Sequence, residues 1–344
     1  MKINTTISEI AKIAKVNKST VSRALNNSPL VNGETKKKIM EIARDLQYFP
    51  NSLARGLINR KSETIGIMLL ELSSLKKTLF IDILKGIESA CVKYGYNMLI
   101  ASLSEQREER TFPFNLIKCN RIDGILNICS PYSLNGFSNS CIVDHPVVSI
   151  NGITKDKNKY CVNFDNYEGG VIGANYFIKR GHSRIAVLTG NQMFNFFKER
   201  IRGYRSVLIK NNILFDKNLL QFGCFEDEIK SGELSTYRLL DLPVPPTAIF
   251  ALTYELAMGA IKAIKRRGLE IPNDIDLMGY GCNELNNIQH FPITTILQNP
   301  FALGFTSCEL LINILNRKEI TGNLFYVPVE LMVKAMRIKK KVYV

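Results

Sequence analysis

The sequence lacks the motifs of several large protein classes. No stretch approaches the roughly 18 apolar residues of a membrane span, and the polar N-terminus has no apolar secretory segment. HExxH, P-loop and GxSxG motifs are missing. The 8 cysteines form no CxxC pair and no metal-ligand spacing, which is typical of reduced, mostly buried thiols. We therefore expect a cytoplasmic chain that binds no membrane, metal or cofactor.

Few residues are placed for catalysis. The 3 histidines, His145, His182 and His290, are scattered, and His182 follows Gly181 at the expected end of a helix, where a structural role is the simpler interpretation. Residues 168–173 (EGGVIG) superficially resemble a dinucleotide-binding fingerprint, but they depart from GxGxxG. Glycines at a helix start also permit close packing. The sequence therefore predicts a protein that is not an enzyme.

Positive charge is present in excess and is unevenly distributed. The 344 residues, enough for about two or three domains, carry a net charge of +14. Residues 1–62 hold 12 Lys or Arg against 4 Asp or Glu, so +8 falls in this short segment. A lysine-rich composition of the whole chain would spread the charge evenly. A concentrated positive field attracts phosphate and makes binding salt-dependent, which favours a nucleic-acid partner.

The first 25 residues predict two short helices joined by a tight turn. Residues 6–9 (TISE) have the form of a capping box, and an apolar pattern through Ile10 follows. Asn17 then caps residues 18–25 (KSTVSRAL), whose Val21 and Ala24 point toward the first helix while the opposite face is polar. This arrangement is typical of a helix-turn-helix, whose second helix enters the major groove. The alternative is a small helical subdomain with a merely solvated polar face.

A third helix and a hinge-like segment complete this pattern. Asn32 is expected to cap a helix from Glu34 to about Gln47, and YFPNSLARGL follows at residues 48–57. The string from TISEIAKIAK to YFPNSLARGL resembles the lactose/galactose repressor family (LacI/GalR) in its TVSRALN recognition helix, its TKKKI third helix and its hinge. This combination at fixed offsets is highly specific. One departure is Lys15, where the family often has a glycine; a positive φ at this turn would carry a modest cost, and Lys15 could also contact a phosphate.

From Ser62 onward the pattern changes to alternating strands and helices. Residues 64–70 (TIGIMLL) form a continuous apolar run, which indicates a buried parallel strand. Further strands are expected at 97–101, 123–128, 147–150, 184–188, 219–222, 248–252 and 276–280, and helices at 83–95, 107–118, 169–179, 201–211, 227–239 and 256–267. Two βαβ series in tandem predict an α/β core of two doubly wound lobes.

The family resemblance continues through this core. The segments VNFDNYEGGVIGANYFIKRGHSRIAVLTG, FKERIRGY, PPTAIFAL, RRGLEIPNDIDLMGYG and TTILQNPFALG resemble the family's landmarks. The resemblance implies a periplasmic-binding-protein-like core whose chain crosses between lobes near Asn163, Phe291 and Tyr326. We therefore expect a helix-turn-helix domain at 1–49, a hinge helix or linker at 50–61, and a core at 62–344. The first lobe would comprise about 62–162 and 293–326, and the second about 163–292 and 327–344.

The resemblance also implies a homodimer that binds a near-palindromic operator in double-stranded DNA. Lys18, Ser19 and Arg23 would contact base edges, where an arginine can donate to guanine through two hydrogen bonds; Lys18 could instead contact only phosphate. Leu57 would enter the minor groove as a wedge, although an exposed leucine near a linker otherwise has no role. The segment 52–58 is too short for a stable isolated helix, so it would form only on correctly spaced DNA. The other expected DNA contacts are Thr6, Thr20, Ser22, Asn26, Asn51 and Ala54.

A ligand in the cleft between the lobes would switch the dimer. Arg200 matches the family arginine that anchors an effector, with an ordinary helix salt bridge as the alternative. Thr253 and Tyr254 replace the family's Asn-Asp pair, and Gly281 replaces an aspartate, so two groups that would bind sugar hydroxyls are missing. A retained cation without its carboxylate favours an anionic sugar derivative or an acid. The other expected effector contacts are Ser73, Phe80, Asn151 and Gln298.

Three alternatives remain for the core. The effector site could have decayed, or the regulator could respond to a phosphorylated carrier protein, as a catabolite-control-type relative does. A third option is a sugar-binding protein without a regulatory role, but such a protein would not need residues 1–57. The last residues, 334–344, contain no leucine heptad of the kind that joins dimers into tetramers, so a dimer is expected.

Overall fold

The computed structural model describes residues 6–48, 61–69, 78–102, 116, 118–128, 146–152, 159–223, 227–282 and 293–333. The chain divides into two compact units, residues 1–62 and 63–344. Each unit has its own hydrophobic core.

The first unit is a three-helix domain made of α1 (Ile7–Ala14), α2 (Lys18–Leu25) and α3 (Gly33–Asp45). The predicted capping box forms, and the Thr6 N–H donates to Glu9 Oε2 at 2.8 Å. Asn32 caps α3 by accepting from the Thr35 N–H at 2.8 Å. One small core joins the helices, formed by the buried residues Ile10, Ala11, Ala14, Val21, Ala24, Ile39 and Ala43. The helix-turn-helix predicted from the sequence is therefore present.

The turn between α1 and α2 has the backbone conformation that favours glycine. Lys15 follows α1 in the left-handed region, with φ 57° and ψ 44°. Its N–H donates to the Lys12 carbonyl at 3.3 Å, and the next N–H, of Val16, donates to Ala11 at 3.0 Å. These bonds close the end of α1 and offset the modest cost of a side chain at positive φ. Lysine is thus accommodated where the family often has glycine.

The second unit contains two six-stranded sheets. The first has the order β11-β5-β4-β3-β1-β2 with parallel pairing throughout, and the second has the order β12-β10-β9-β8-β6-β7 with only β12 antiparallel. The strands of the first sheet are β1 (Thr64–Leu69), β2 (Asn97–Ser102), β3 (Gly124–Ile128), β4 (Val147–Ile150), β5 (Tyr160–Phe164) and β11 (Leu324–Val327). Those of the second are β6 (Ile185–Thr189), β7 (Leu220–Phe222), β8 (Ala248–Ala251), β9 (Asp276–Cys282), β10 (Thr294–Gln298) and β12 (Glu330–Met332). The two predicted α/β lobes are confirmed.

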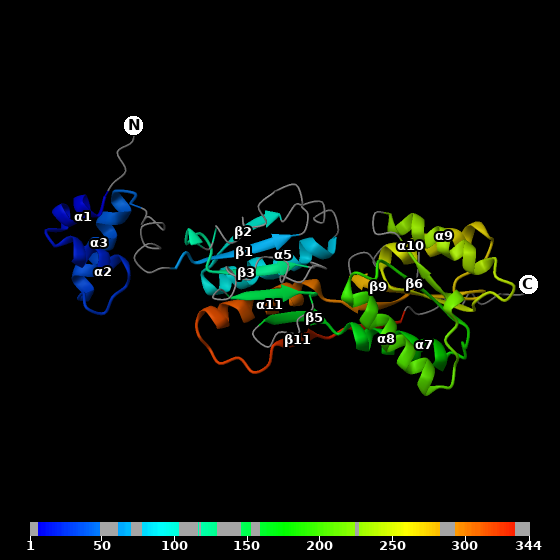
Figure 1. The fold of residues 1–344 in the computed structure, drawn as a ribbon. Helices are drawn as coiled ribbons and strands as arrows, with labels where there is room; N and C mark the ends of the chain where they lie inside the picture. Colours follow the sequence, from blue (N-terminus) through cyan, green and yellow to red (C-terminus); the bar gives the residue numbers. More distant parts are fainter. Residues whose placement is uncertain are drawn as a thin grey trace, which may run out of the picture. The chain divides into compact units, whose positions relative to one another are not determined.

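Pairs of helices cover the sheets (Figure 1). In the first lobe, α5 (Thr78–Tyr94) packs against α11 (Pro300–Leu315). In the second lobe, α7 (Asn166–Lys179) and α8 (Asn195–Lys210) share a core with alternate strand residues such as Val187. The intervening strand residues, such as Leu188, pack with α9 (Glu228–Leu240) and α10 (Tyr254–Arg266). Because side chains alternate along a strand, each helix pair covers one face of the second sheet. A short 3-10 helix (Lys217–Leu219) precedes β7.

Glycines set the spacing within each of these helix pairs. The pairs come closest at Gly86 and Gly304, at Gly170 and Gly203, and at Gly232 and Gly259. A Cβ on Gly170, for example, would collide with the Arg200 carbonyl oxygen of α8. Gly169 and Gly173 likewise leave room for the Tyr280 and Phe250 rings. The EGGVIG segment is therefore a close-packing motif inside α7, as the non-enzymatic interpretation expected.

One predicted lobe boundary differs from the structure. The chain leaves the first sheet after β5 and the second sheet after β10, and it passes between the sheets again between β11 and β12. Residues 294–298 had been assigned to the first lobe, but β10 pairs with β9 in the second sheet. The crossing therefore follows Gln298 instead of lying near Phe291, because this strand extends the second sheet before α11 begins on the first.

Among the cysteines whose side chains the structure describes, Cys91, Cys161 and Cys308 are buried and Cys119 is exposed. Burial raises the pKa of Cys161 to about 11, which keeps this thiol protonated at neutral pH. Across the described ranges, no helix is long and apolar enough to cross a membrane, and no group of three or more His, Cys, Asp or Glu side chains could hold a metal.

Candidate functional site

The first candidate site is the polar face of α2. Val21 and Ala24 are buried against the other helices, and this fixes which side of α2 faces outward. Lys18, Ser19 and Arg23 are exposed on that outward side. Of the other expected DNA contacts, Thr6 and Asn26 are exposed, and Thr20 and Ser22 are half-buried. The helix thus presents long donors to solvent from its first two turns.

The start of α2 also offers backbone donors. Asn17 is the N-cap residue, with extended backbone, but its side chain makes no capping hydrogen bond. The first N–H groups of a helix have no partner within the helix, and the helix dipole is positive at this end. Such a terminus attracts a phosphate oxygen. Positive charge nearby comes from exposed Lys12 of α1, Lys15 of the turn and Lys18 of α2.

Four expected contact residues lie outside the described residues. Asn51, Ala54 and Leu57 belong to the hinge segment, and Ser73 follows β1. Their roles stay predictions.

The second candidate site is built around Arg200, on the buried side of α8. Its guanidinium donates through Nε to Asn166 Oδ1 at 2.9 Å and through Nη1 to the Leu252 carbonyl oxygen. The same group stacks on the Tyr280 ring, with Cζ 3.6 Å from the ring centroid. These partners lie at the start of α7, just after β8 and in β9. Arg200 therefore connects elements at the carboxyl ends of the second sheet, where ligands of doubly wound folds bind.

Tyr280 and Asn166 belong to this group but escaped the sequence analysis. Tyr280 is 1% exposed, and burial raises its pKa, an effect that the nearby Arg200 guanidinium opposes. Asn166 is also buried and donates to the Phe164 carbonyl at 3.1 Å, which holds its amide oxygen toward Arg200. Both residues stood within segments that carry the family resemblance, but spacing alone does not show that they meet Arg200.

A buried carboxylate lies beside Thr253. The Thr253 hydroxyl donates to Glu228 Oε2 at 2.7 Å and accepts from the Leu256 N–H at 3.2 Å, so Thr253 also caps α10. Glu228 is 5% exposed at the start of α9. Glu228 and Thr253 are 25 positions apart in the chain, so no local pattern in the sequence predicts that this carboxylate lies beside Thr253.

The structure places the remaining expected effector residues in two lobes. Gly281 lies in β9, where an added Cβ would sit 3.2 Å from the Tyr254 Cβ, so it belongs with Arg200 and Thr253. Gln298 is buried at the end of β10. In the first lobe, Asn151 follows β4 with φ 53° and accepts from the Phe164 N–H at 3.4 Å, and Phe80 is buried in the first turn of α5.

The comparisons with known proteins cover both units of the chain. Residues 6–51 match the model of bacterial regulatory proteins of the lacI family, and residues 174–335 match a periplasmic binding protein-like domain. The chain is 34% identical to the probable HTH-type transcriptional repressor ExuR of Bacillus subtilis, over 80% of this chain and 81% of that protein. It is 29% identical to the HTH-type transcriptional repressor CytR of Escherichia coli K12, over 96% and 95% of the two chains.

The solved structures show the same fold. The Lac repressor dimer bound to operator and the anti-inducer ONPF matches with a TM-score of 0.82 at 24% identity, covering 96% of this chain and 98% of that one. A complex of the transcriptional regulator CelR with cellobiose matches with a TM-score of 0.70 at 23% identity, covering 96% and 99%.

Proposed function

The chain belongs to the lacI family of bacterial regulatory proteins, and we propose which of its residues bind DNA and which bind the effector. As a member of this family it is a DNA-binding transcriptional regulator switched by an effector. Residues 18, 19 and 23 contact base edges of an operator, and the other exposed groups of α1 and α2 contact phosphates. The exposed polar face of α2 carries this proposal. The protein acts in the cytoplasm as a homodimeric repressor without enzymatic activity, and Leu57 of each hinge enters the minor groove.

Footprinting on the DNA flanking its own gene tests this function. A dimer with two recognition helices should protect a near-palindromic site of two half-sites about one helical turn apart. Its affinity should fall steeply with salt, with a log–log slope of roughly −0.9 for each phosphate that the protein neutralises. A salt-independent interaction, or no symmetric protected site, would contradict the proposal.

For the effector we propose a hydroxylated ligand carrying a carboxylate or phosphate. The helix N-termini of α7 and α10 flank Arg200, since Asn166 begins α7 and Leu252 immediately precedes the cap residue of α10. The buried guanidinium favours an anion, while the Asp165 cap of α7 and the first-turn residues Glu168 and Glu255 offset the positive ends of the two helices. The negative charge of Glu228 opposes anion binding. Its carboxylate would orient the ligand by accepting a hydrogen bond from a hydroxyl at the end of the ligand away from the anionic group. In the alternative, the regulator responds to a phosphorylated carrier protein, and no small molecule acts as its effector.

Calorimetry with a neutral hexose, its phosphate and its acid measures the effector preference. A charge-assisted contact contributes about 1.5–3 kcal/mol, so the anionic ligands should bind at least about tenfold tighter than the neutral one. Arg200→Ala should remove the difference, whereas Glu228→Gln should widen it, because the substitution removes the negative charge that opposes the anion while the amide oxygen can still accept a hydroxyl. Equal affinities in the native protein would refute the anionic effector, and no binding by any ligand would favour the protein corepressor.

A further inference from the structure

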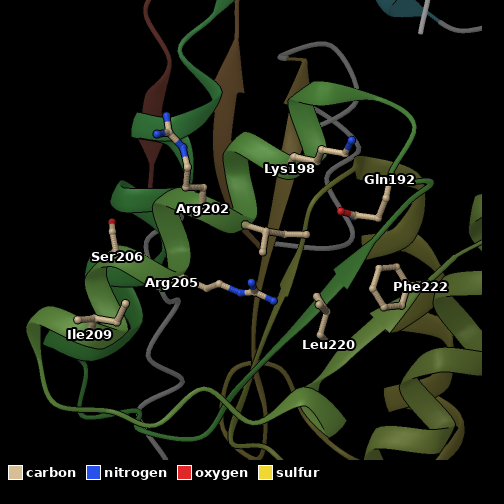
Figure 2. Close-up of a pocket in the computed structure, with 9 residues that line it drawn as sticks. Gln192, Lys198, Arg202, Arg205, Ser206, Ile209, Leu220 and Phe222 are labelled. Atoms are coloured by element: carbon tan, nitrogen blue, oxygen red, sulfur yellow. The ribbon is translucent and has the colours of Figure 1, made fainter.

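A groove lies on the other side of α8, away from Arg200. It has a volume of about 450 Å³ and is lined by residues of α8, by β7 and by Gln192 (Figure 2). Lys198, Arg202, Arg205 and Ile209 follow one stripe of α8 at helical spacing. Leu220 and Phe222 are two residues apart in β7, so their side chains share one face of the strand and form the opposite wall of the groove. Neither proposed task of the protein uses this groove.

The groove combines cations with exposed apolar side chains. Arg202 pairs with Glu199 at 2.6 Å, but within the described part of the chain Lys198 and Arg205 have no carboxylate within ion-pair distance. Arg205 extends across the groove toward Leu220 (Figure 2). Its guanidinium lies over the Phe215 ring, 4.0 Å from the ring centroid. Ile209 is 75% exposed and Phe222 is 54% exposed. Exposed apolar surface rimmed by charge marks a site of protein contact.

The backbone beside the groove adds a second feature. β7 is the edge strand of its sheet and pairs only with β6 among the described strands. An edge strand presents N–H and C=O groups that an extended peptide can pair with, while side-chain pockets give specificity. A strand of three residues offers too few backbone hydrogen bonds to hold a peptide by itself, so side-chain contacts in the groove must contribute to the affinity.

We propose that this groove binds an extended acidic segment of a partner protein. The segment pairs with β7, places apolar side chains on Leu220, Phe222 and Ile209, and brings carboxylates to Lys198 and Arg205. A two-fold contact with a second copy would instead place these cations against their own equivalents, which repel. Nucleic acid would satisfy the cations but would leave the apolar wall and the strand edge unused.

Binding of short synthetic peptides to the full-length protein, followed by fluorescence anisotropy, tests this proposal. The probes are a peptide alternating glutamate with valine, one alternating lysine with valine, and one alternating glutamate with serine. The glutamate–valine peptide should bind saturably, more weakly as salt rises, and at least about tenfold tighter than the other two. Equal binding of all three peptides, or no binding, would overturn the proposal.

Variants locate the site and separate it from operator binding. The double variant Lys198→Glu/Arg205→Glu should bind the glutamate–valine peptide at least about tenfold more weakly than the native protein. Lys179→Glu/Lys210→Glu makes the same charge change at exposed positions outside the groove and should have little effect. Phe222→Ser should also weaken the peptide. All three variants should retain native operator affinity, which distinguishes failure here from failure of the proposed function. Complete competition by non-specific duplex DNA would assign the groove to nucleic acid, and a concentration-dependent assembly abolished by Phe222→Ser would assign it to a second copy.

Discussion

Replacing Arg23 with alanine should relax base preference at one position in each operator half-site by about 1–3 kcal/mol. Arg23 lies in the last turn of α2, exposed, while Val21 and Ala24 hold the helix in the core. Its loss should therefore leave the three-helix domain folded and remove only the proposed contact to DNA. Binding to a panel of operators with single base changes, compared between native and Arg23→Ala proteins, measures the effect.

Arg44→Ala is the matched control for this experiment. Arg44 is exposed in the last turn of α3, so the substitution removes the same charge from the same domain but not from α2. It should leave the ranking of operator sequences unchanged. If Arg23→Ala weakened all operators equally, the arginine would contact phosphate, and Lys18 and Ser19 would carry the base contacts.

Replacing Gly170 with alanine should lower the free energy of unfolding of the core by about 1–3 kcal/mol or more, as overpacking does. The new methyl group would collide with the Arg200 carbonyl oxygen and press on the Tyr204 N–H, both in the backbone of α8. Backbone cannot rotate away, so the two helices must separate. Because Arg200 bonds to Asn166 across this contact, the effector affinity should fall as well.

Urea unfolding monitored by circular dichroism, together with calorimetry of the effector, measures both losses. Gly33→Ala serves as the control, since an added Cβ at this first residue of α3 meets nothing within 4 Å. It should leave stability almost unchanged. An unchanged urea midpoint for Gly170→Ala would show that α7 and α8 tolerate a wider spacing.

Local sequence signals were sufficient for the three helices of the first unit and for most strands of the core, but the expected elements did not include β5, β10, β11, β12 or α11. Capping residues and apolar periodicity are properties of neighbouring residues, so Asn32 and the 18–25 pattern predicted their helices without tertiary information. The positive φ of Lys15 agrees with the glycine that the family often has at this turn. The buried apolar runs, such as 64–69, likewise predicted the parallel strands.

Contacts between distant segments depended on the tertiary structure. The carboxylate of Glu228 meets Thr253, and Arg200 meets Leu252, because strands β7 to β9 end at the same edge of one sheet, a property of strand order that no local pattern carries. The assignment of β10 to the second lobe is likewise a matter of pairing, since a buried strand has the same apolar pattern in either sheet. The sequence determined the helices of the first unit and most strands of the core, whereas the packing of those elements decided which polar groups surround Arg200.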